Sequence, residues 1–437
     1  MYIKQNRQIS LVIAVFVLFV FFWFIFFMFR STITITISSD ENTVIFISRN
    51  SDEGFSEIGG ENVTYKTREE GDLYIRVEQN GNISMTSLFV VSGDNKDVYL
   101  PVAPSRPLEE YLDGGSYAHP LFDGRIVQGI DPGSGSIINF SLDSTSAPRR
   151  IEFLGIPSLR YIYWEDKDNF VYSSFRSGVG IFSDGQNRGN ISENQNINVT
   201  ASDGSELRNI FFSAVSWHPE QPVILLGDRG VYSMNDIDGN TIERLIPIAV
   251  VGSQLLFSDS EYIYVNNELL PGSFVSETDE LTQVDQLDNI MDTQSTTTIY
   301  SYSGEEKFSI NTVGSKVIDA VSIKNGTAII LLGENNISIT DILGEGYSSK
   351  NISTPFSVNR DMFVIDDTVY VLSDDGLWRL LKEPGVLQLV STFNGIGLRN
   401  SMTKDYQNEF LYLGTQRSPD GSGKSAVYRI LISDLEQ

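Results

Sequence analysis

Cysteine is absent from this chain of 437 residues, and histidine occurs only twice, as His119 and His218. Without cysteine the chain has no disulfides, no thiolate nucleophiles and no Cys-ligated metal sites. Two imidazoles are too few for a three-His zinc site within one chain. Each histidine also precedes a proline, which biases its backbone to an extended or turn conformation and favours a structural role over catalysis. We therefore expect no metal and no cofactor.

Basic residues are also scarce, at 31 Lys and Arg against 57 Asp and Glu. Three of the 31, Lys4, Arg7 and Arg30, lie in the first 30 residues, which hold no acid, so 28 basic and 57 acidic side chains follow. A surface this acidic repels phosphate backbones and anionic lipid head groups. Nucleic acid is therefore not an expected partner.

The segment Ile9–Phe29 has no charged residue, and Ser10 is its one polar side chain. At about 1.5 Å per residue its 21 residues span roughly 30 Å, the thickness of a bilayer core. A cleaved signal peptide is the alternative, but its apolar core would be shorter and would end at a small-x-small site. Here the aromatic run Phe26–Arg30 follows instead, which favours an uncleaved anchor.

The charges that flank this segment give its orientation. Lys4 and Arg7 precede it, and only Arg30 follows before Arg49, so the positive-inside rule places the N-terminus in the cytoplasm. We expect a cytoplasmic tail at 1–8, one transmembrane helix at 9–29 through which the chain contacts the cell membrane, and extracytoplasmic residues 31–437.

The region 31–102 has the alternation of β-strands. Residues 31–38 read "STITITIS", and "LYIRV", "ISMTSLFVV" and "VYLPV" follow between turns, which predicts a small antiparallel β-sandwich. The run from "GDLYIRVEQNG" to "DVYLPV" resembles the second half of a PEGA-type domain, a β-fold common on bacterial surface proteins, although the Pro-Glu-Gly-Ala core is missing. Two prolines in 103–107 then indicate an exposed linker at 103–116.

From residue 117 onward, short strands recur in groups. Val223–Leu226 is an apolar run followed by turn, strand, turn and strand, and similar runs begin near residues 224, 255, 299, 329, 369 and 410. Repeats of about 40 residues made of four short strands indicate a β-propeller. At roughly 40 to 45 residues per blade, 117–437 would hold seven or eight blades. The expected fold class is therefore all-β after an N-terminal transmembrane helix.

The stretch "VSWHPEQPVILLGDRGVYSM" resembles the TolB or WD40-like propeller repeat. Trp217, Pro219 and Tyr232 match that repeat's Trp-x-Pro turn and second-strand aromatic, whereas Glu220-Gln221 stands where Asp-Gly is preferred. The resemblance implies a fold and no activity. It predicts that Trp217 packs between blades and that His218 opens a turn.

No motif names a catalytic, cofactor-binding or metal-binding residue, and the binding residues stay unassigned. Gly421–Ser425 mimics the end of a phosphate-binding loop but lacks the upstream glycine, and Asn235–Gly239 mimics a calcium loop with Met234 at its first ligand position. Polar residues predict a long loop at 185–205, and spaced apolar residues predict a short helix at 278–294. Glycosylation is left open at eight Asn-x-Ser/Thr triplets: Asn62, Asn82, Asn139, Asn190, Asn198, Asn325, Asn336 and Asn351.

Together these features predict a single-pass membrane protein of bacterial type that presents a propeller to a protein or to an envelope glycan, and they favour a binding protein over an enzyme. The alternative is an anchored hydrolase of glycosidase or lactonase type that uses carboxylates at the propeller channel. The two hypotheses differ in whether several carboxylates with raised pKa values converge at that channel. Oligomeric state does not follow from the sequence.

Overall fold

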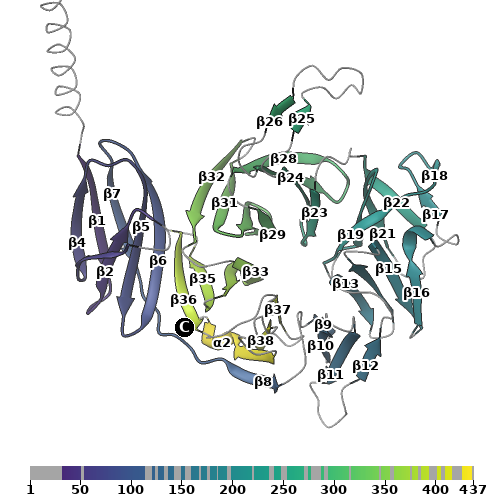
Figure 1. The fold of residues 1–437 in the computed structure, drawn as a ribbon, viewed down its shortest axis with the longest axis horizontal. Helices are drawn as coiled ribbons and strands as arrows, with labels where there is room; N and C mark the ends of the chain where they lie inside the picture. The colour runs from purple at the N-terminus through teal and green to yellow at the C-terminus, as the bar shows by residue number, and fades with distance from the viewer. Residues whose placement is uncertain are drawn as a thin grey trace, which may run out of the picture. The chain divides into compact units, whose positions relative to one another are not determined.

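The computed structural model describes residues 32–50, 54–113, 121–123, 126–131, 136–141, 149–152, 159–166, 169–174, 178–184, 186–193, 198–218, 221–235, 241–247, 253–269, 274–276, 287–289, 294–313, 316–343, 346–354, 359–374, 376–381, 385–392, 401–404, 409–415 and 426–435. It divides into two compact units, Met1–Ala103 and Pro104–Gln437, called unit 1 and unit 2 below. Both are built almost wholly of β-strands (Figure 1).

Unit 1 contains two sheets. The first has the order β4-β1-β7, from β1 (Ile33–Ser39), β4 (Asn62–Thr67) and β7 (Asn95–Leu100). The second pairs β3 with β2, β2 with β5 and β5 with β6, from β2 (Val44–Ser48), β3 (Ser56–Gly59), β5 (Gly71–Gln79) and β6 (Asn82–Val90). The prediction of a wholly antiparallel sandwich is wrong at one pair, because β1 and β7, the first and last strands of the unit, run parallel.

The alternation of β1 is confirmed. Ile33, Ile35 and Ile37 are fully buried, whereas the threonines between them keep partial exposure. In a strand successive side chains point to opposite faces, so a Thr-Ile repeat gives one apolar row for a core. Leu73 and Ile75 of β5 contribute to the buried apolar set of the same unit.

Unit 2 is a β-propeller, in which sheets that are antiparallel except at the β17–β22 pair are arranged in a ring (Figure 1). The sheets, each from its innermost strand outward, are: β9 (Leu121–Asp123), β10 (Ile126–Asp131), β11 (Ser136–Ser141) and β12 (Arg149–Glu152); β13 (Leu159–Asp166), β14 (Asn169–Ser174), β15 (Gly178–Ser183) and β16 (Gln186–Asn190); β19 (Phe212–Ser216), β20 (Val223–Gly227), β21 (Gly230–Met234) and β22 (Thr241–Ile246), extended by β17 (Asn198–Thr200) and β18 (Glu206–Leu207); β23 (Ser253–Ser258), β24 (Tyr262–Leu269), β27 (Gln294–Ser301) and β28 (Glu306–Val313); β29 (Val317–Ile323), β30 (Ala328–Gly333), β31 (Asn336–Leu343) and β32 (Gly346–Ser353); β33 (Asn359–Ile365), β34 (Thr368–Ser373), β35 (Gly376–Leu381) and β36 (Val386–Thr392); β37 (Ser401–Lys404), β38 (Phe410–Thr415), β39 (Ala426–Leu431) and β8 (Glu109–Asp113).

Three short elements complete unit 2. β25 (Phe274–Ser276) and β26 (Leu287–Asn289) form a separate hairpin, η1 (Ile191–Glu193) is a single 3-10 turn, and α2 (Ile432–Leu435) follows the last strand. The innermost strands contact one another in cyclic order, β9, β13, β19, β23, β29, β33, β37 and again β9. The ring of inner strands is therefore closed.

The ring closes through strands from the two ends of unit 2. β39 lies between β38 and β8, with Ala426 opposite Asp113 and Arg429 opposite Glu109. The Arg429 guanidinium also donates to both carboxylate oxygens of Glu109, at 2.7 and 3.0 Å. β8 lies inside the segment 103–116 that the two prolines had suggested was a linker, because the short run after Pro107 is used as an outer strand. With this pairing β39 has a neighbouring strand on both sides, and β8 becomes the outer edge strand of the closing sheet.

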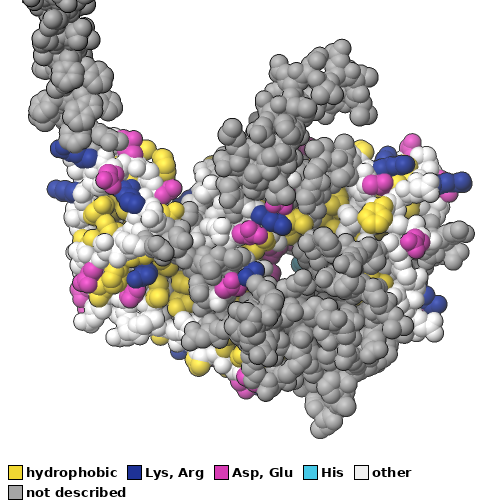
Figure 2. Space-filling model, in the orientation of Figure 1, with side chains coloured by type: hydrophobic (Ala, Val, Ile, Leu, Met, Phe, Trp, Pro, Cys, Tyr) yellow, Lys and Arg dark blue, Asp and Glu magenta, His cyan; other side chains and the backbone are white. Residues whose placement is uncertain are grey.

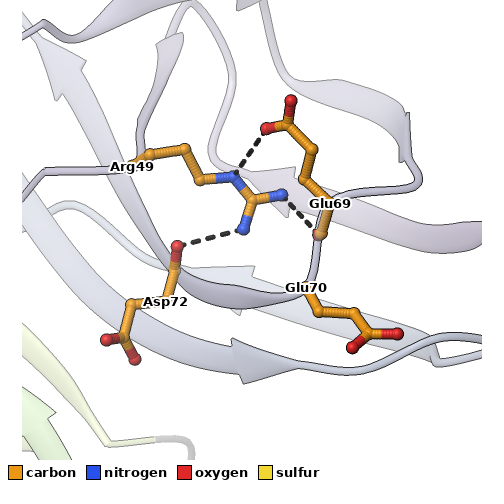
Figure 3. Close-up of a pocket in the computed structure, with 4 residues that line it drawn as sticks. All are labelled: Arg49, Glu69, Glu70 and Asp72. Carbon is orange, nitrogen blue, oxygen red and sulfur yellow. Dashed lines mark hydrogen bonds and ion pairs between the residues drawn. The ribbon is translucent and has the colours of Figure 1, made fainter.

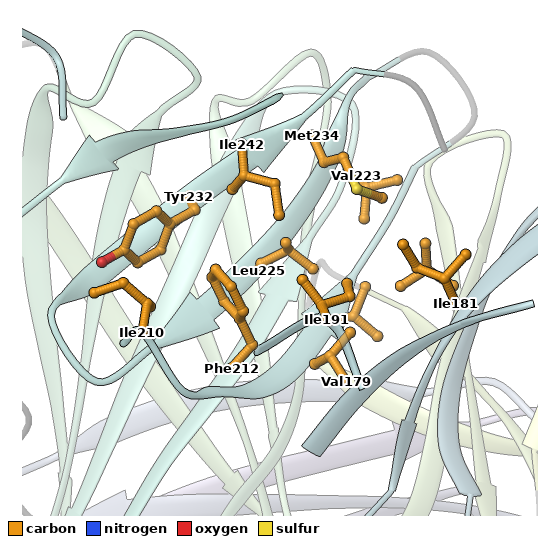
Figure 4. Packing of buried hydrophobic residues seen from close by; sticks show 12 residues of the cluster. Val179, Ile181, Ile191, Ile210, Phe212, Val223, Leu225, Tyr232, Met234 and Ile242 are labelled. Atoms are coloured by element: carbon orange, nitrogen blue, oxygen red, sulfur yellow. The ribbon is translucent and has the colours of Figure 1, made fainter. Parts of the chain in front are cut away.

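Apolar cores lie between neighbouring sheets. Val171 and Val179 of β14 and β15 pack in one cluster with Phe212, Leu225 and others from the β19–β22 sheet (Figure 4). The alternate residues Ile224 and Leu226 of β20 instead pack with Leu256, Ile263 and Val265 of the next sheet. Both faces of β20 are therefore buried, which explains why "VILLG" is a continuous apolar run rather than an alternating one.

Two local predictions are wrong where the structure describes them. The predicted loop 185–205 contains β16, η1 and β17, because the polar segment adds strands to existing sheets. The predicted helix 278–294 contains β26, and its other residues lie largely outside the described ones. Within the described residues, no helix is long and apolar enough to cross a bilayer; the predicted span Ile9–Phe29 lies outside those residues.

Candidate functional site: carboxylates of the inner strands

Two inner strands carry an aspartate at the same structural position. In β29 the pairing with β30 shifts between Val317 and Asp319, and in β33 the pairing with β34 shifts between Asn359 and Asp361. A bulge of this kind re-aims the residue that follows it. β19 has the same shift, but Ala214 follows it there. The fold therefore permits a carboxylate at this position without requiring one.

Each aspartate first binds its own backbone. The N–H of Ala320 donates to Oδ1 of Asp319 at 2.8 Å, and the N–H of Met362 donates to Oδ1 of Asp361 at 3.0 Å. Short polar side chains commonly bond nearby backbone groups in this way. These bonds hold each carboxylate at the start of its strand.

Asp361 also binds the backbone of the neighbouring inner strand. The N–H of Met402 in β37 donates to Oδ2 of Asp361 at 2.5 Å, which links the β33 sheet to the β37 sheet. The charge of Asp361 and the Met362 N–H group of β33 both act on the Asp319 carboxyl of β29, so the two carboxyls lie close together.

Asp259 makes a second link, from the turn after β23. Its Oδ2 accepts from the N–H of Ser322 in β29 and from the Tyr264 hydroxyl, both at 2.5 Å. Its Oδ1 accepts from the N–H groups of Glu261 and Tyr262 at 2.8 Å. Both oxygens of Asp259 are therefore occupied by protein donors.

The electrostatics follow from this arrangement. Burial raises the pKa of Asp319 well above its ordinary value, and the negative charges of Asp361 and Asp259 raise it further. Burial raises the pKa of Asp361 to about 7, against the opposing effect of the N–H groups of Met402 and Met362. Ionising both of two neighbouring, poorly solvated carboxyl groups costs free energy because their charges repel, so such a pair holds one proton. We expect the Asp319 and Asp361 pair to retain a proton at neutral pH.

A buried hydroxyl reports the same environment. The pKa of Tyr264 lies well above 10, first because the ring is buried and then because the charge of Asp259 opposes ionisation. The phenol therefore stays a hydrogen-bond donor to Asp259. Among the described residues, no three Asp, Glu or His side chains form a group that could hold a metal ion.

Chemically, the arrangement fits a structural link better than a catalytic pair. A glycosidase needs two carboxylates that flank a substrate, one protonated as the acid and one ionised. Here a proton is shared and the pKa values are raised, but the oxygens face backbone N–H groups of the protein. Asp259 joins the β23 sheet to β29, and Asp361 joins β33 to β37.

The residues that the sequence drew attention to lie elsewhere. Trp217 packs against the core cluster between the β13–β16 and β19–β22 sheets, as predicted. His218 is partly exposed, and its carbonyl accepts from the N–H of Gln221 at 2.9 Å in a turn. His119, Gly421–Ser425 and most of Asn235–Gly239 lie outside the described residues.

The sequence patterns did not single out Asp259, Asp319 or Asp361 as site residues. A signal did exist, because Asp319 and Asp361 each stand four residues before the isoleucine that ends an inner strand, in "DAVSI" and "DMFVI". In a chain with 57 acidic residues this spacing does not stand out. Asp259 has no such counterpart.

No protein-family model matches the chain, and no curated protein matches it. Among solved structures, the chain is similar to the extracellular domain of a one-component system from B. thetaiotaomicron, with 11% identity and a TM-score of 0.44, over 80% of this chain. The match spans only 45% of that domain's own length. It is also similar to the WD40 β-propeller domain of Doa1 (9% identity, TM-score 0.46, 75% of this chain and 98% of that one). A further similar structure is the β-propeller domain of Cps50 (Swd1) from Myceliophteria thermophila (11% identity, TM-score 0.43, 74% and 99%).

Proposed function

We propose that this chain is a single-pass membrane protein that presents a rigid β-propeller outside the cytoplasm to a protein or envelope-glycan partner. In this proposal Ile9–Phe29 spans the cell membrane, the N-terminus is cytoplasmic and 31–437 are extracytoplasmic. Unit 1 is a PEGA-like spacer, and unit 2 is a propeller of seven blades. The length of the apolar segment and the basic residues before it support the anchor.

One observation supports a binding role over a catalytic one. The carboxylates of Asp259 and Asp361 accept hydrogen bonds from backbone N–H groups of neighbouring sheets, and Asp319 accepts one from Ala320 of its own strand. Such bonds fix the sheets relative to one another and use the oxygens that a hydrolase would turn toward its substrate. A ring fixed in this way is a rigid support for loops, and loops on a rigid support are where propellers and similar folds bind partners.

A hydrolase is the second candidate, and the pair Asp319 and Asp361 is the observation that favours it. Two adjacent carboxylates with raised pKa values, one of them near 7, are also what general acid catalysis needs. Both residues are half-buried rather than fully enclosed. The two candidates therefore predict different results from the same substitution.

The test compares the full chain with Asp319→Asn and Asp361→Asn variants against glycoside, ester and lactone substrates. Asp366→Asn, at an exposed turn of the same sheet as Asp361, is the matched control. We expect no turnover above that of heat-denatured protein in any of them, and lower stability in the two inner-strand variants. Saturable turnover that disappears in Asp319→Asn or Asp361→Asn but persists in Asp366→Asn would establish the hydrolase instead.

The binding half of the proposal has its own test. The full chain carrying both His119→Gln and His218→Gln should retain whatever envelope material the unmodified chain retains, because neither imidazole is assigned a role in recognition. Loss of retention in the doubly substituted chain, with folding unchanged, would show that an imidazole takes part.

A further inference from the structure

One end of unit 1 is defined by the start of β1. Ile33 pairs there with Thr67, the last residue of β4, and the N–H of Thr34 donates to the carbonyl of Asp94 at 2.8 Å. The Lys96 ammonium donates to the carbonyl of Phe89 at 2.6 Å. The loops 67–72 and 90–95 therefore lie beside the residues at which the chain enters unit 1.

This end exposes apolar side chains. Phe89 is 65% exposed and Val91 is 45% exposed, the former near the end of β6 and the latter at the start of the loop. The loop is held by its own bonds, because the Val91 N–H donates to Oδ2 of Asp94 and the Asp94 N–H donates to the Val91 carbonyl, both at 3.0 Å. The end of β6 and the turn that follows it thus expose two hydrophobic side chains, Phe89 and Val91. Exposed apolar groups gathered at one place commonly mark an interaction surface.

The local charge differs from that of the rest of the extracytoplasmic chain. Four basic residues stand near the start of β1 together with four acidic ones: Arg49, Lys66, Arg68 and Lys96 with Glu69, Glu70, Asp72 and Asp94. Elsewhere acids outnumber bases by about two to one, as the 28 basic and 57 acidic residues after residue 30 require. Basic and acidic side chains can be seen close together on unit 1 in Figure 2. Counted over the described residues, this end therefore lacks the excess negative charge that would repel anionic lipid.

The charges at this end also bind one another. Figure 3 shows the Arg49 guanidinium between Glu69 and Asp72, where it donates to the carbonyls of Asp72 at 3.0 Å and Glu69 at 2.8 Å. Its Nε lies 3.8 Å from the Glu69 carboxylate, and Lys96 lies 3.1 Å from the Asp94 carboxylate. These pairs leave the local surface close to neutral.

Chain length limits how far this end can be from the bilayer. Only Arg30, Ser31 and Thr32 separate Phe29 from Ile33. Four fully extended steps span at most about 14 Å. The headgroup layer outside the hydrocarbon core occupies roughly 5 to 8 Å of that distance. Side chains that project from the loop at 90–95 can therefore reach the headgroups.

We propose that the end of unit 1 at which β1 begins rests on the membrane, with Phe89 and Val91 inserted among the lipid headgroups. The proposal rests on the proposed anchoring by Ile9–Phe29. The partner is a lipid surface, because the patch is apolar, nearly neutral and tied within a few residues of the predicted span. Its effect would be to fix the orientation of unit 1 on the bilayer.

The absence of cysteine allows a single-label experiment on the full chain. One chain carries Ser92→Cys, beside the two apolar residues, and another carries Glu41→Cys, in the turn at the far end of β1. Each is labelled with a polarity-sensitive fluorophore and reconstituted into vesicles of phosphatidylethanolamine and phosphatidylglycerol that contain a nitroxide lipid quencher at a shallow position. A third chain combines Ser92→Cys with Phe89→Ser and Val91→Ser, and flotation on a density gradient reports anchoring in all three.

We expect all three chains to float with the vesicles, strong quenching at position 92, no quenching at position 41, and loss of quenching at position 92 when Phe89 and Val91 are replaced. Because both replaced side chains are exposed, circular dichroism should show an unchanged fold. Flotation with equal quenching at positions 92 and 41, or unchanged quenching in the serine variant, would overturn the lipid contact while leaving the anchor intact. Failure of the chain to float would overturn the anchor and, with it, this inference.

Discussion

Removal of the last strand should unfold the whole propeller rather than one sheet. Deletion of 425–437 removes β39 and α2, and with them four almost fully buried side chains: Val427, Ile430, Ile432 and Leu435. At about 1.5 to 3 kcal/mol for each fully buried aliphatic side chain, the deletion costs about 6 to 12 kcal/mol. A typical folded domain is stable by only about 5 to 15 kcal/mol. The loss is therefore comparable with the entire stability of unit 2.

Two point substitutions give a graded version of the same test. Ile430→Ala removes a side chain that is 4% exposed, and should lower the free energy of unfolding by about 2 to 5 kcal/mol. Leu431→Ala changes the next residue of the same strand, which is 41% exposed, and should change it by no more than about 0.5 kcal/mol. Denaturant unfolding of the full chain in detergent measures both.

Hydrogen exchange distinguishes loss of the ring from local fraying. If closure by β39 and β8 holds the ring, the deletion should remove protection from the amides of β20 and β21, which belong to a different sheet. Normal protection of β20 and β21, with exchange confined to β37 and β38, would refute the reasoning. So would a truncated chain that melts at the same temperature as the intact one.

Three further predictions concern other parts of the chain. Burial raises the pKa of Asp361 to about 7 in the folded protein, so the folded state binds the proton more tightly than the unfolded state, and stability should fall as pH rises from about 4 to about 7. In Asp361→Asn the free energy of unfolding should depend less steeply on pH over this range. An identical slope in the variant would contradict the assignment. Gly230 has a φ of 144°, and a Cβ added there would lie 2.1 Å from the Ile246 carbonyl oxygen, whereas Gly204 has a φ of 80° and a Cβ added there would meet nothing within 4 Å. Gly230→Ala should therefore lower the melting temperature far more than Gly204→Ala. Equal changes in melting temperature would contradict this prediction. If Ile9–Phe29 spans the membrane, protease added to intact cells should digest residues 31–437 and leave the segment before Ile9 protected. Release of a soluble form beginning after residue 30 would instead show that the segment is a cleaved signal peptide.

Local patterns were enough to predict most strands. The Thr-Ile alternation before Ser39 and the apolar run Val223–Gly227 are both strands, because period-two burial and full burial leave direct traces in composition. The position of Trp217 between two sheets was predicted by the resemblance to the TolB or WD40-like repeat, and it is confirmed. The loop predicted at 185–205 from its polar residues is wrong. β16 and β17 lie in this segment and are stabilised by pairing with strands of existing sheets, which cannot be predicted from the composition of the segment.

The aspartate links show the opposite case. Asp259, Asp319 and Asp361 are each separated from the next by more than 40 positions in the sequence. The N–H groups that Asp259 and Asp361 bind, those of Ser322 and Met402, belong to other sheets. Nothing local distinguishes them from the exposed acids of the turns. Burial raises the pKa of Asp319 and of Asp361, and the charges of Asp361 and Asp259 raise that of Asp319 further; both effects require the ring to exist first.

The sequence by itself determined the strand repeat, the all-β class and the exclusion of thiol and multi-histidine chemistry, because periodicity and residue supply are properties of the chain alone. The tertiary structure decided how the ring closes, with β8, from the segment predicted to be a linker, paired beside β39. It also decided which acidic residues lie close together, namely Asp319 and Asp361. Those features depend on contacts between distant segments, where pairing partners are chosen by the geometry of the closed ring and not by the residues nearby in sequence.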